Sequence, residues 1–334
     1  MNENNKRELF WSQEHKPVAG VHPHEKVQVY QLAETEQILA ETVIDSGLGG
    51  ETVELVQISD LHINRISALD KDDEEVLLTL KHRYAFSQHE IIVSVDRMLR
   101  LAKYTDLLVL SGDIMDFLSE GNRETVQRMI FHKFPEALYV TGYHEFCKHV
   151  QTGQTDRLPF EERQAKVQSF WPNNIFYTTR DIKDKVIAVG LYNNLHYDER
   201  EIEPFKKDIE RARREHKIIL IFEHEPISTG RPEDKHAPTI LQGWREEWNV
   251  YDGPVIGGPQ QTNDTDRAML DLITGNADVV KGIFHGHYHD IMYTEVPGFY
   301  TDASGRHEVK IPQIGASACC YFGGVGIGNR IIVK

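Results

Sequence analysis

Five blocks of the sequence place histidine and carboxylate side chains directly after an apolar, β-prone run. The blocks run from Val56 to His62, from Leu107 to Asp113, from Ala137 to Phe146, from Ile218 to His224 and from Val279 to His289. Carboxylate oxygen and imidazole nitrogen are ligands that Zn²⁺, Mn²⁺ and Fe prefer in proteins. The repeated pattern therefore predicts metal chemistry at the ends of buried strands.

The elements between these blocks explain how residues far apart in sequence can meet. Apolar residues recur at helical spacing from Ile91 to Ala102, between the strand predicted at 53–59 and the strand at 107–110. A strand, a helix and a second strand form a βαβ unit with a parallel strand pair. Because the carboxyl ends of parallel strands open on one crevice, we expect these side chains to converge: Asp60, His62, Asp113, His144, His224, His287 and His289.

This set contains more potential ligands than one ion of coordination four to six would use. The excess suggests two metal ions bridged by one carboxylate. Two ions about 3.5–4 Å apart can generate a hydroxide at neutral pH and offset the charge of a displacement at phosphorus. Mixed nitrogen and oxygen ligands accept Mn, Fe or Zn, so the identity of the metal stays open.

The ordered blocks resemble the calcineurin-like metallophosphoesterase family. The motifs are Asp60-x-His62, Gly112-Asp113, Gly142-x-His144-Glu145, His224 and Gly286-His287-x-His289, and the resemblance covers about residues 53–290. Each motif is weak alone, whereas five in order, each closing a strand, are specific. The resemblance implies an α/β fold: a four-layer α/β/β/α sandwich with two central mixed sheets flanked by helices.

The resemblance also implies a role for each residue. Asp60, His62 and His289 would hold the first metal, Asp113 would bridge both, and His224 and His287 would hold the second. His144 would act as general acid, oriented by Glu145, which suits an imidazole near neutral pKa. A hydroxide bridging the metals would be the nucleophile.

Tyr143 departs from the family, which has Asn at this position as a ligand of the second metal. A phenol oxygen lies farther from its backbone than an amide oxygen, and it must lose a proton with an ordinary pKa of about 10 to ligate well. Three outcomes are open: the second site is weakened or empty, Tyr143 swings aside and water or substrate completes the shell, or the phenolate ligates. Whether Tyr143 is natural or engineered is open as well.

Two further residues lie close to the motifs. Asp116 comes three positions after Asp113 and is either a support for the ligands or a solvated loop acid. His285 alternates with His287 and His289 but precedes the motif. We interpret it as a hydrogen-bonded residue that belongs either to the core or to the groups that support the ligands.

Composition excludes several classes of protein. The chain of 334 residues carries a formal charge of −15, which argues against an extended nucleic-acid-binding face. The three cysteines, Cys147, Cys319 and Cys320, form no disulfide framework. The sequence has no apolar run of the ~20 residues that span a bilayer and no signal-peptide pattern at its start. We therefore expect a cytoplasmic protein with a small-molecule substrate, and the sequence leaves its oligomeric state open.

We expect an N-terminal extension over residues 1–50, read as an extended arm with short β segments, and one metallophosphoesterase domain over residues 51–334. A long loop from Pro226 to Gln261 is predicted to lie over the site. The expected reaction is hydrolysis of a phosphoester, with a phosphodiester favoured over a monoester because Ser59-Asp60-Leu61-His62 resembles bacterial phosphodiesterase-like members. The alternatives are a non-catalytic binding scaffold and a nuclease of the same superfamily.

Overall fold

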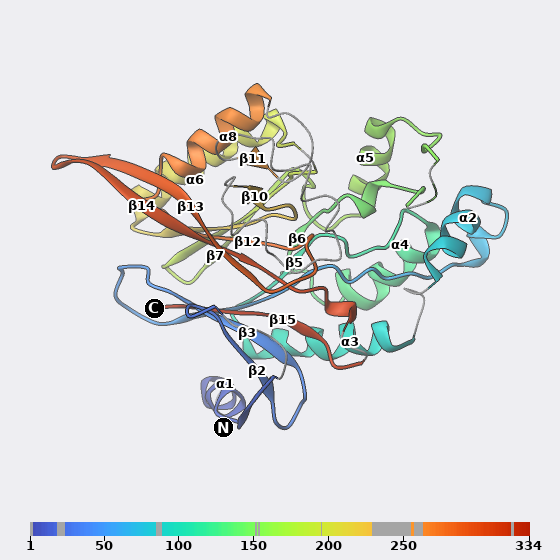
Figure 1. Ribbon diagram of the computed structural model, residues 1–334, viewed down its shortest axis with the longest axis horizontal. Coiled ribbons are helices and arrows are strands. Elements are labelled where there is room, and N and C mark those ends of the chain that lie inside the picture. The colour runs from blue at the N-terminus through green and yellow to red at the C-terminus, as the bar shows by residue number, and fades with distance from the viewer. Residues whose placement is uncertain are drawn as a thin grey trace.

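Two mixed β-sheets face each other, and helices cover the outer face of each (Figure 1). The structure is a computed structural model that describes residues 3–18, 24–84, 89–150, 152, 154–194, 196–228, 255–256, 263–321 and 324–334. The loop predicted at Pro226–Gln261 lies mostly outside the described residues. Within the described part of the chain, no helix has the length and apolar character needed to cross a membrane.

The first sheet has seven strands and contains three of the strands that end in candidate ligands. In spatial order its strands are β1 (His15–Pro17), β2 (Gln28–Leu32), β3 (Ile38–Ile44), β15 (Ile327–Val333), β4 (Val53–Ile58), β5 (Leu107–Ser111) and β6 (Leu138–Val140). Strands β4, β5 and β6 are parallel neighbours, whereas β15 is antiparallel to β4 and parallel to β3. The βαβ prediction for β4 and β5 is therefore confirmed.

The second sheet has six strands and supplies the remaining candidates. Its order is β13 (Met292–Asp302), β14 (Gly305–Gly315), β12 (Val280–His285), β9 (Ile218–Phe222), β8 (Val186–Leu191) and β7 (Tyr177–Ile182). Strands β14, β12, β9 and β8 run parallel, and β13 and β7 are antiparallel edge strands. A short pair, β10 (Ile227–Ser228) with β11 (Val255–Ile256), lies apart from both sheets.

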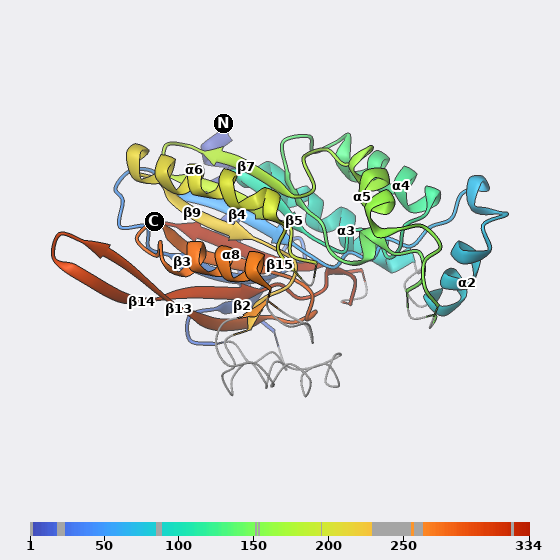
Figure 2. The same ribbon diagram turned by 90° about the horizontal axis from the view of Figure 1, so that it is seen from above.

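Seven helices in the described residues connect or cover the strands. They are α1 (Glu3–Trp11), α2 (Glu74–His82), α3 (His89–Leu99), α4 (Glu120–Val126), α5 (Phe160–Gln168), α6 (Glu199–Glu215) and α8 (Asp264–Thr274). Figures 1 and 2 show α6 and α8 on one side of the sheets, with α3 on the other. The predicted apolar face of α3 is buried through Ile91, Val95 and Met98. Helices α6 and α8 both begin with a capping box, which satisfies N–H groups of the first turn.

Three apolar layers separate the four layers of secondary structure. One cluster joins the helix-facing side of the first sheet to α3 and includes Val56 and Met98. A second joins the six-stranded sheet to α6 and α8 and includes Phe205 and Met269. The third lies between the sheets and contains side chains of both, among them Phe222. Strands buried on both faces read as continuous apolar runs, which is why they stood out in the sequence. The predicted four-layer architecture is confirmed.

The first 50 residues contribute to the seven-stranded sheet. Strand β3 pairs with β15 along seven residues, and β2 and β1 extend the sheet beyond it. Glu3–Trp11 form a helix, where the sequence analysis predicted an extended arm. The prediction of an extended arm rested on Pro17 and on the polar start of the sequence. It did not take account of Trp11, which is buried and whose indole donates a hydrogen bond to the Tyr104 carbonyl over 3.0 Å.

Candidate metal centre

The candidate site residues leave the sheets where parallel strands end. Asp60 and His62 follow β4, Asp113 follows β5, His144 follows β6, His224 follows β9, and His287 and His289 follow β12. A bridge between Ser59 and Ala318 and a hydrogen bond from the Cys319 amide to the Ser59 carbonyl fix the chain next to Asp60. The carboxyl ends of both sheets therefore meet at one centre, as the sequence predicted.

The backbone at this centre is unusual. Five site residues have left-handed backbone angles: Asp60 (φ 52°), His62 (φ 46°), Asp113 (φ 49°), His287 (φ 68°) and His289 (φ 58°). Such conformations are uncommon outside glycine and cost on the order of 1–3 kcal/mol each. Backbone hydrogen bonds stabilise two of these strained conformations: the amides of Asp60 and His62 donate to the carbonyls of Gly112 and Asp113, respectively. Strain gathered at one polar centre points to function.

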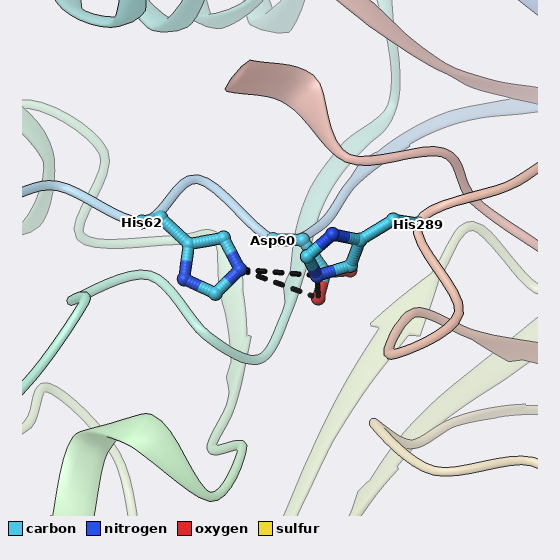
Figure 3. Close-up of side chains that lie close together, drawn as sticks. All are labelled: Asp60, His62 and His289. Atoms are coloured by element: carbon cyan, nitrogen blue, oxygen red, sulfur yellow. Dashed lines mark hydrogen bonds and ion pairs between the residues drawn. The ribbon is translucent and has the colours of Figure 1, made fainter. Parts of the chain in front are cut away.

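Asp60, His62 and His289 converge in a first ligand group (Figure 3). The Nε2 atoms of His62 and His289 lie 3.1 Å apart. Oδ1 of Asp60 lies 3.0 Å from Nε2 of His289 and 3.9 Å from Nε2 of His62. Three potential donor atoms thus point at one small volume.

Asp113 joins this group to a second one. Its Oδ2 lies 3.1 Å from Nε2 of His224, which in turn lies 4.0 Å from Oδ1 of Asp60. Asp60, Asp113 and His224 form one potential ligand group, and His62, Asp113 and His144 form another. Asp113 is therefore shared by two of the three groups, as is Asp60.

Two neighbouring groups fix which nitrogen of each imidazole faces the centre. Nδ1 of His224 lies 2.9 Å from the Ser111 carbonyl, which can only accept, so this nitrogen carries a proton. Nδ1 of His62 lies 3.0 Å from the buried carboxylate of Asp116. In both rings Nε2 is left to face the centre, as is usual for histidines whose other nitrogen is held by an acceptor.

His144 lies beside Asp113, with its Nε2 3.8 Å from Oδ2. Its Nδ1 donates to the Asp116 carbonyl over 2.6 Å and lies 3.5 Å from the Asp116 carboxylate. Asp116 therefore orients the ring. The sequence left open whether Asp116 supports the ligands or is a solvated loop acid, and its contacts and burial agree with the first interpretation. The spacing of three after Asp113 was the only sequence signal for it.

Glu145 is buried and holds the loops rather than the His144 ring. Its carboxylate accepts the amides of Asp113 (3.0 Å), Met115 (2.9 Å) and Gly142 (2.6 Å). Burial, followed by the charge of Asp113, raises the pKa of Glu145 to about 8. It ties the segment after β5 to the segment after β6.

Tyr143 and His287 differ from the other predicted ligands. His287 belongs to none of the three groups of His, Cys, Asp and Glu donor atoms that converge among the described residues. The Tyr143 side chain is 42% exposed, and its ring meets the His144 ring edge-on with centroids 6.4 Å apart. Burial and then the neighbouring Cys147 thiol raise the pKa of Tyr143, which works against phenolate ligation. His287 lies closer to the centre: its ring is 5.4 Å from that of His224, and its amide donates to Asp60 over 3.1 Å.

The acids and imidazoles of the centre shift one another's protonation. Burial raises the pKa of Asp60, but the adjacent His289 outweighs it and holds the pKa below its ordinary range. Burial lowers the pKa of His224 and of His144, but the carboxylate of Asp113 outweighs it and raises these pKa values to about 10 and about 9. Burial lowers the pKa of His62 to about 4. The carboxylates of Asp60 and Asp113 are thus ionised, and a cation at the centre would offset their charge.

Two glycines give these side chains room. A Cβ at Gly142 would overlap Oδ1 of Asp113, and one at Gly286 would overlap the Ser59 hydroxyl. The neighbouring chain would have to move to accept any side chain at either position. Both glycines belong to the motifs, so the sequence signal has a steric cause.

The donor set fits divalent transition ions. Imidazole nitrogens and carboxylate oxygens converge within 4.8 Å of one another in each group, with Nε2 turned to the centre. Two imidazole nitrogens 3.1 Å apart beside a carboxylate are a stable arrangement when a proton or cation lies among them. The convergence that the family resemblance implied is present.

No protein-family model matches the sequence, and no curated protein matches it. Several solved structures are similar to it in three dimensions. A dimetal phosphatase from Danio rerio is 12% identical with a TM-score of 0.45, over 83% of this chain and 90% of that one. A purple acid phosphatase from yellow lupin (Lupinus luteus) is 10% identical with a TM-score of 0.44, over 91% of this chain and 48% of that one.

A putative 5′-nucleotidase from Staphylococcus aureus is 12% identical with a TM-score of 0.34, over 79% of this chain and 54% of that one. Identities this low say nothing about a shared substrate. The function of the chain has to be argued from the ordered motifs and from the geometry at which they converge.

Proposed function

We propose that this protein is a metal-dependent phosphoester hydrolase with two divalent ions at the ends of β4, β5, β9 and β12. The observation that carries the proposal is the convergence of three overlapping ligand groups on Asp60 and Asp113. Asp60, His62 and His289 would hold one ion, and His224 with His287 the other, with Asp113 between them. When bound, the ions would lower the pKa of a water and offset negative charge at phosphorus.

His144 would hold the proton needed by the leaving oxygen. Its Nδ1 is committed to the Asp116 carbonyl, so Nε2 is the atom that faces Asp113 and the substrate. Asp113 raises the pKa of this imidazole, which favours the protonated form at neutral pH. A positioned acid of this kind contributes about 10²–10⁴-fold to a rate. Glu145 keeps the segments of Asp113 and His144 together through their amides.

Within this class we favour a phosphodiester as substrate. The support is the motif Ser59-Asp60-Leu61-His62, which resembles bacterial phosphodiesterase-like members. Tyr143 supports a further element of the proposal: its exposed side chain and raised pKa favour a second site completed by water or substrate, or left weak, over phenolate ligation. Tyr143 is also the observation that would favour a non-catalytic binding scaffold.

The test compares hydrolysis of bis(p-nitrophenyl) phosphate and p-nitrophenyl phosphate in the presence of Mn²⁺, Zn²⁺ or Fe²⁺. Asp113→Asn removes the bridging charge, and His307→Asn is a matched control on the β13–β14 hairpin, where His307 pairs with Asp302. We expect the unaltered protein and the control to hydrolyse the diester faster than the monoester, and Asp113→Asn to lose activity. Absence of metal-dependent turnover in all three would favour the scaffold.

A further inference from the structure

Arg83 is buried next to the candidate centre, although no motif pointed to it. It follows directly after α2, and its Nε donates to both carboxylate oxygens of Asp116 over 3.0 Å. A second guanidinium nitrogen also donates to Oδ1 of Asp116. Arg83 is 4% exposed and Asp116 is 0% exposed, so the pair is shielded from water. A planar guanidinium fixes a carboxylate by its forked geometry as well as by its charge.

The carboxylate that Arg83 holds is shared by both functional imidazoles. Oδ1 of Asp116 lies 3.0 Å from Nδ1 of His62 and 3.5 Å from Nδ1 of His144. The Asn64 side chain donates to Oδ2 over 2.9 Å. A rotation of the Asp116 side chain would therefore disturb a candidate metal ligand and the candidate acid together.

Helix α2 is tied at its other end to the segment that follows His144. Asp73, which caps the helix, pairs with Lys148 over 2.6 Å, and Glu75 lies 3.1 Å from Nε2 of His149. Between the two ends, Val76 packs in a small apolar cluster with Phe117 and Cys147. The helix thus spans from residues 147–149 to Asp116, and Figures 1 and 2 show it at the edge of the molecule, away from the sheets.

We propose that Arg83 is a positioning residue, which acts through Asp116 to hold His62 toward the metal and His144 toward the leaving group. The proposal rests on the proposed function and deepens it. Without the guanidinium, the buried Asp116 carboxylate loses a buried counter-charge and the forked contact that fixes its rotamer. His62 then loses the partner of its Nδ1, so its Nε2 is no longer held toward the centre. The Nδ1 of His144 keeps its hydrogen bond to the Asp116 carbonyl, but this ring loses the fixed carboxylate 3.5 Å away. Changes to such supporting groups cost about 10–100-fold in metal affinity or activity.

The chain offers a matched control. Arg330 is 6% exposed and pairs with Glu41 (2.8 Å) and Glu54 (2.7 Å), so it is also a buried arginine between carboxylates. It lies on β15 and has no part in the Asp116 network. Arg330→Met therefore reproduces the loss of a buried ion pair without touching the site.

The experiment measures two quantities on the full chain of the unaltered protein, Arg83→Met, Arg83→Lys and Arg330→Met. The first is Mn²⁺ affinity by equilibrium dialysis. The second is the ratio of kcat for bis(p-nitrophenyl) phosphate to kcat for diphenyl phosphate, which has the poorer leaving group. For Arg83→Met we expect Mn²⁺ binding weakened about tenfold or more and diphenyl phosphate turnover lost about tenfold more than that of the activated diester. Arg83→Lys should give intermediate values.

Arg330→Met should leave both quantities near those of the unaltered protein. The proposal is overturned if Arg83→Met matches Arg330→Met in both. If Arg83→Met does not fold, Arg83→Lys is compared with Arg330→Met instead. The proposal is then overturned if Arg83→Lys has the same Mn²⁺ affinity and the same kcat ratio as the unaltered protein. If the unaltered protein hydrolyses neither diester, the proposed function fails, and the dialysis still decides for or against Arg83 as the group that positions His62.

Discussion

Metal uptake should displace a proton from His224. In the metal-free protein, burial lowers the pKa of this imidazole, but Asp113 outweighs burial and raises it to about 10 from an ordinary 6.5. This rise in the pKa corresponds to something on the order of 5 kcal/mol of stabilisation of the metal-free fold. Because the folded pKa is the raised one, this contribution is fully present below pH 6.5 and is lost as the pH rises through about 10.

A ligand imidazole has to be neutral, so an ion that binds Nε2 of His224 takes the place of that proton. At pH 8 the displacement amounts to about one proton per chain from His224, and the affinity rises up to about tenfold per pH unit as long as His224 is protonated. His62 contributes little to this count, because burial lowers its pKa to about 4.

The assay is titration calorimetry with Mn²⁺ at pH 8 in buffers of different ionisation enthalpy, which gives the number of protons released. The difference between the unaltered protein and His224→Asn isolates His224 from other groups such as His144. His307→Asn serves as the control, because His307 lies on the β13–β14 hairpin. Equal proton release by the unaltered protein and His224→Asn would refute the reasoning.

Three other changes test separate parts of the site. His144→Asn should lower kcat for a poor leaving group by about 10²–10⁴-fold with metal content unchanged, and loss of metal on elemental analysis would contradict its assignment as the acid. Gly142→Ala puts a methyl group onto Oδ1 of Asp113 and should abolish metal binding in dialysis, whereas unchanged binding would show that the loop yields. Glu223 is buried with Tyr197 donating to it over 2.7 Å, and burial raises its pKa to about 8. Its folded pKa lies above its unfolded value, so stability should fall from pH 4.5 to 8. Glu223→Gln should flatten that fall in denaturant titrations of the metal-free protein, and an unchanged fall would contradict it.

The strands that carry the site could be predicted from the sequence because they are buried on both faces. The strands predicted at 53–59 and 107–110 lie within one residue of the bounds that the structure shows, Val53–Ile58 and Leu107–Ser111. Short apolar runs rich in β-branched residues are typical of strands buried on both faces. The residues at their ends followed from the rule that parallel strands open on one crevice. The glycines of the motifs are needed because side chains meet at that crevice.

The sequence could not show contacts that join distant segments outside the motifs. Arg83 and Asp116 are 33 positions apart, and neither spacing nor composition connects them. Glu145 was expected at the His144 ring, whereas its carboxylate turns to the amides of Asp113, Met115 and Gly142. Adjacency in sequence did not show which way this side chain points, because Glu145 lies inside the tight 3₁₀ turn His144–Phe146.

The most direct test of the account is metal content per chain, by elemental analysis, together with hydrolysis of bis(p-nitrophenyl) phosphate, for this protein and for Tyr143→Asn. We expect metal and turnover in this protein, with equal or higher values for Tyr143→Asn. An amide oxygen can complete the ligand set of the second ion, whereas the exposed phenol does not. Two metals and turnover in both would mean that Tyr143 is accommodated. Neither metal nor turnover in either protein would contradict the hydrolase and leave a binding scaffold.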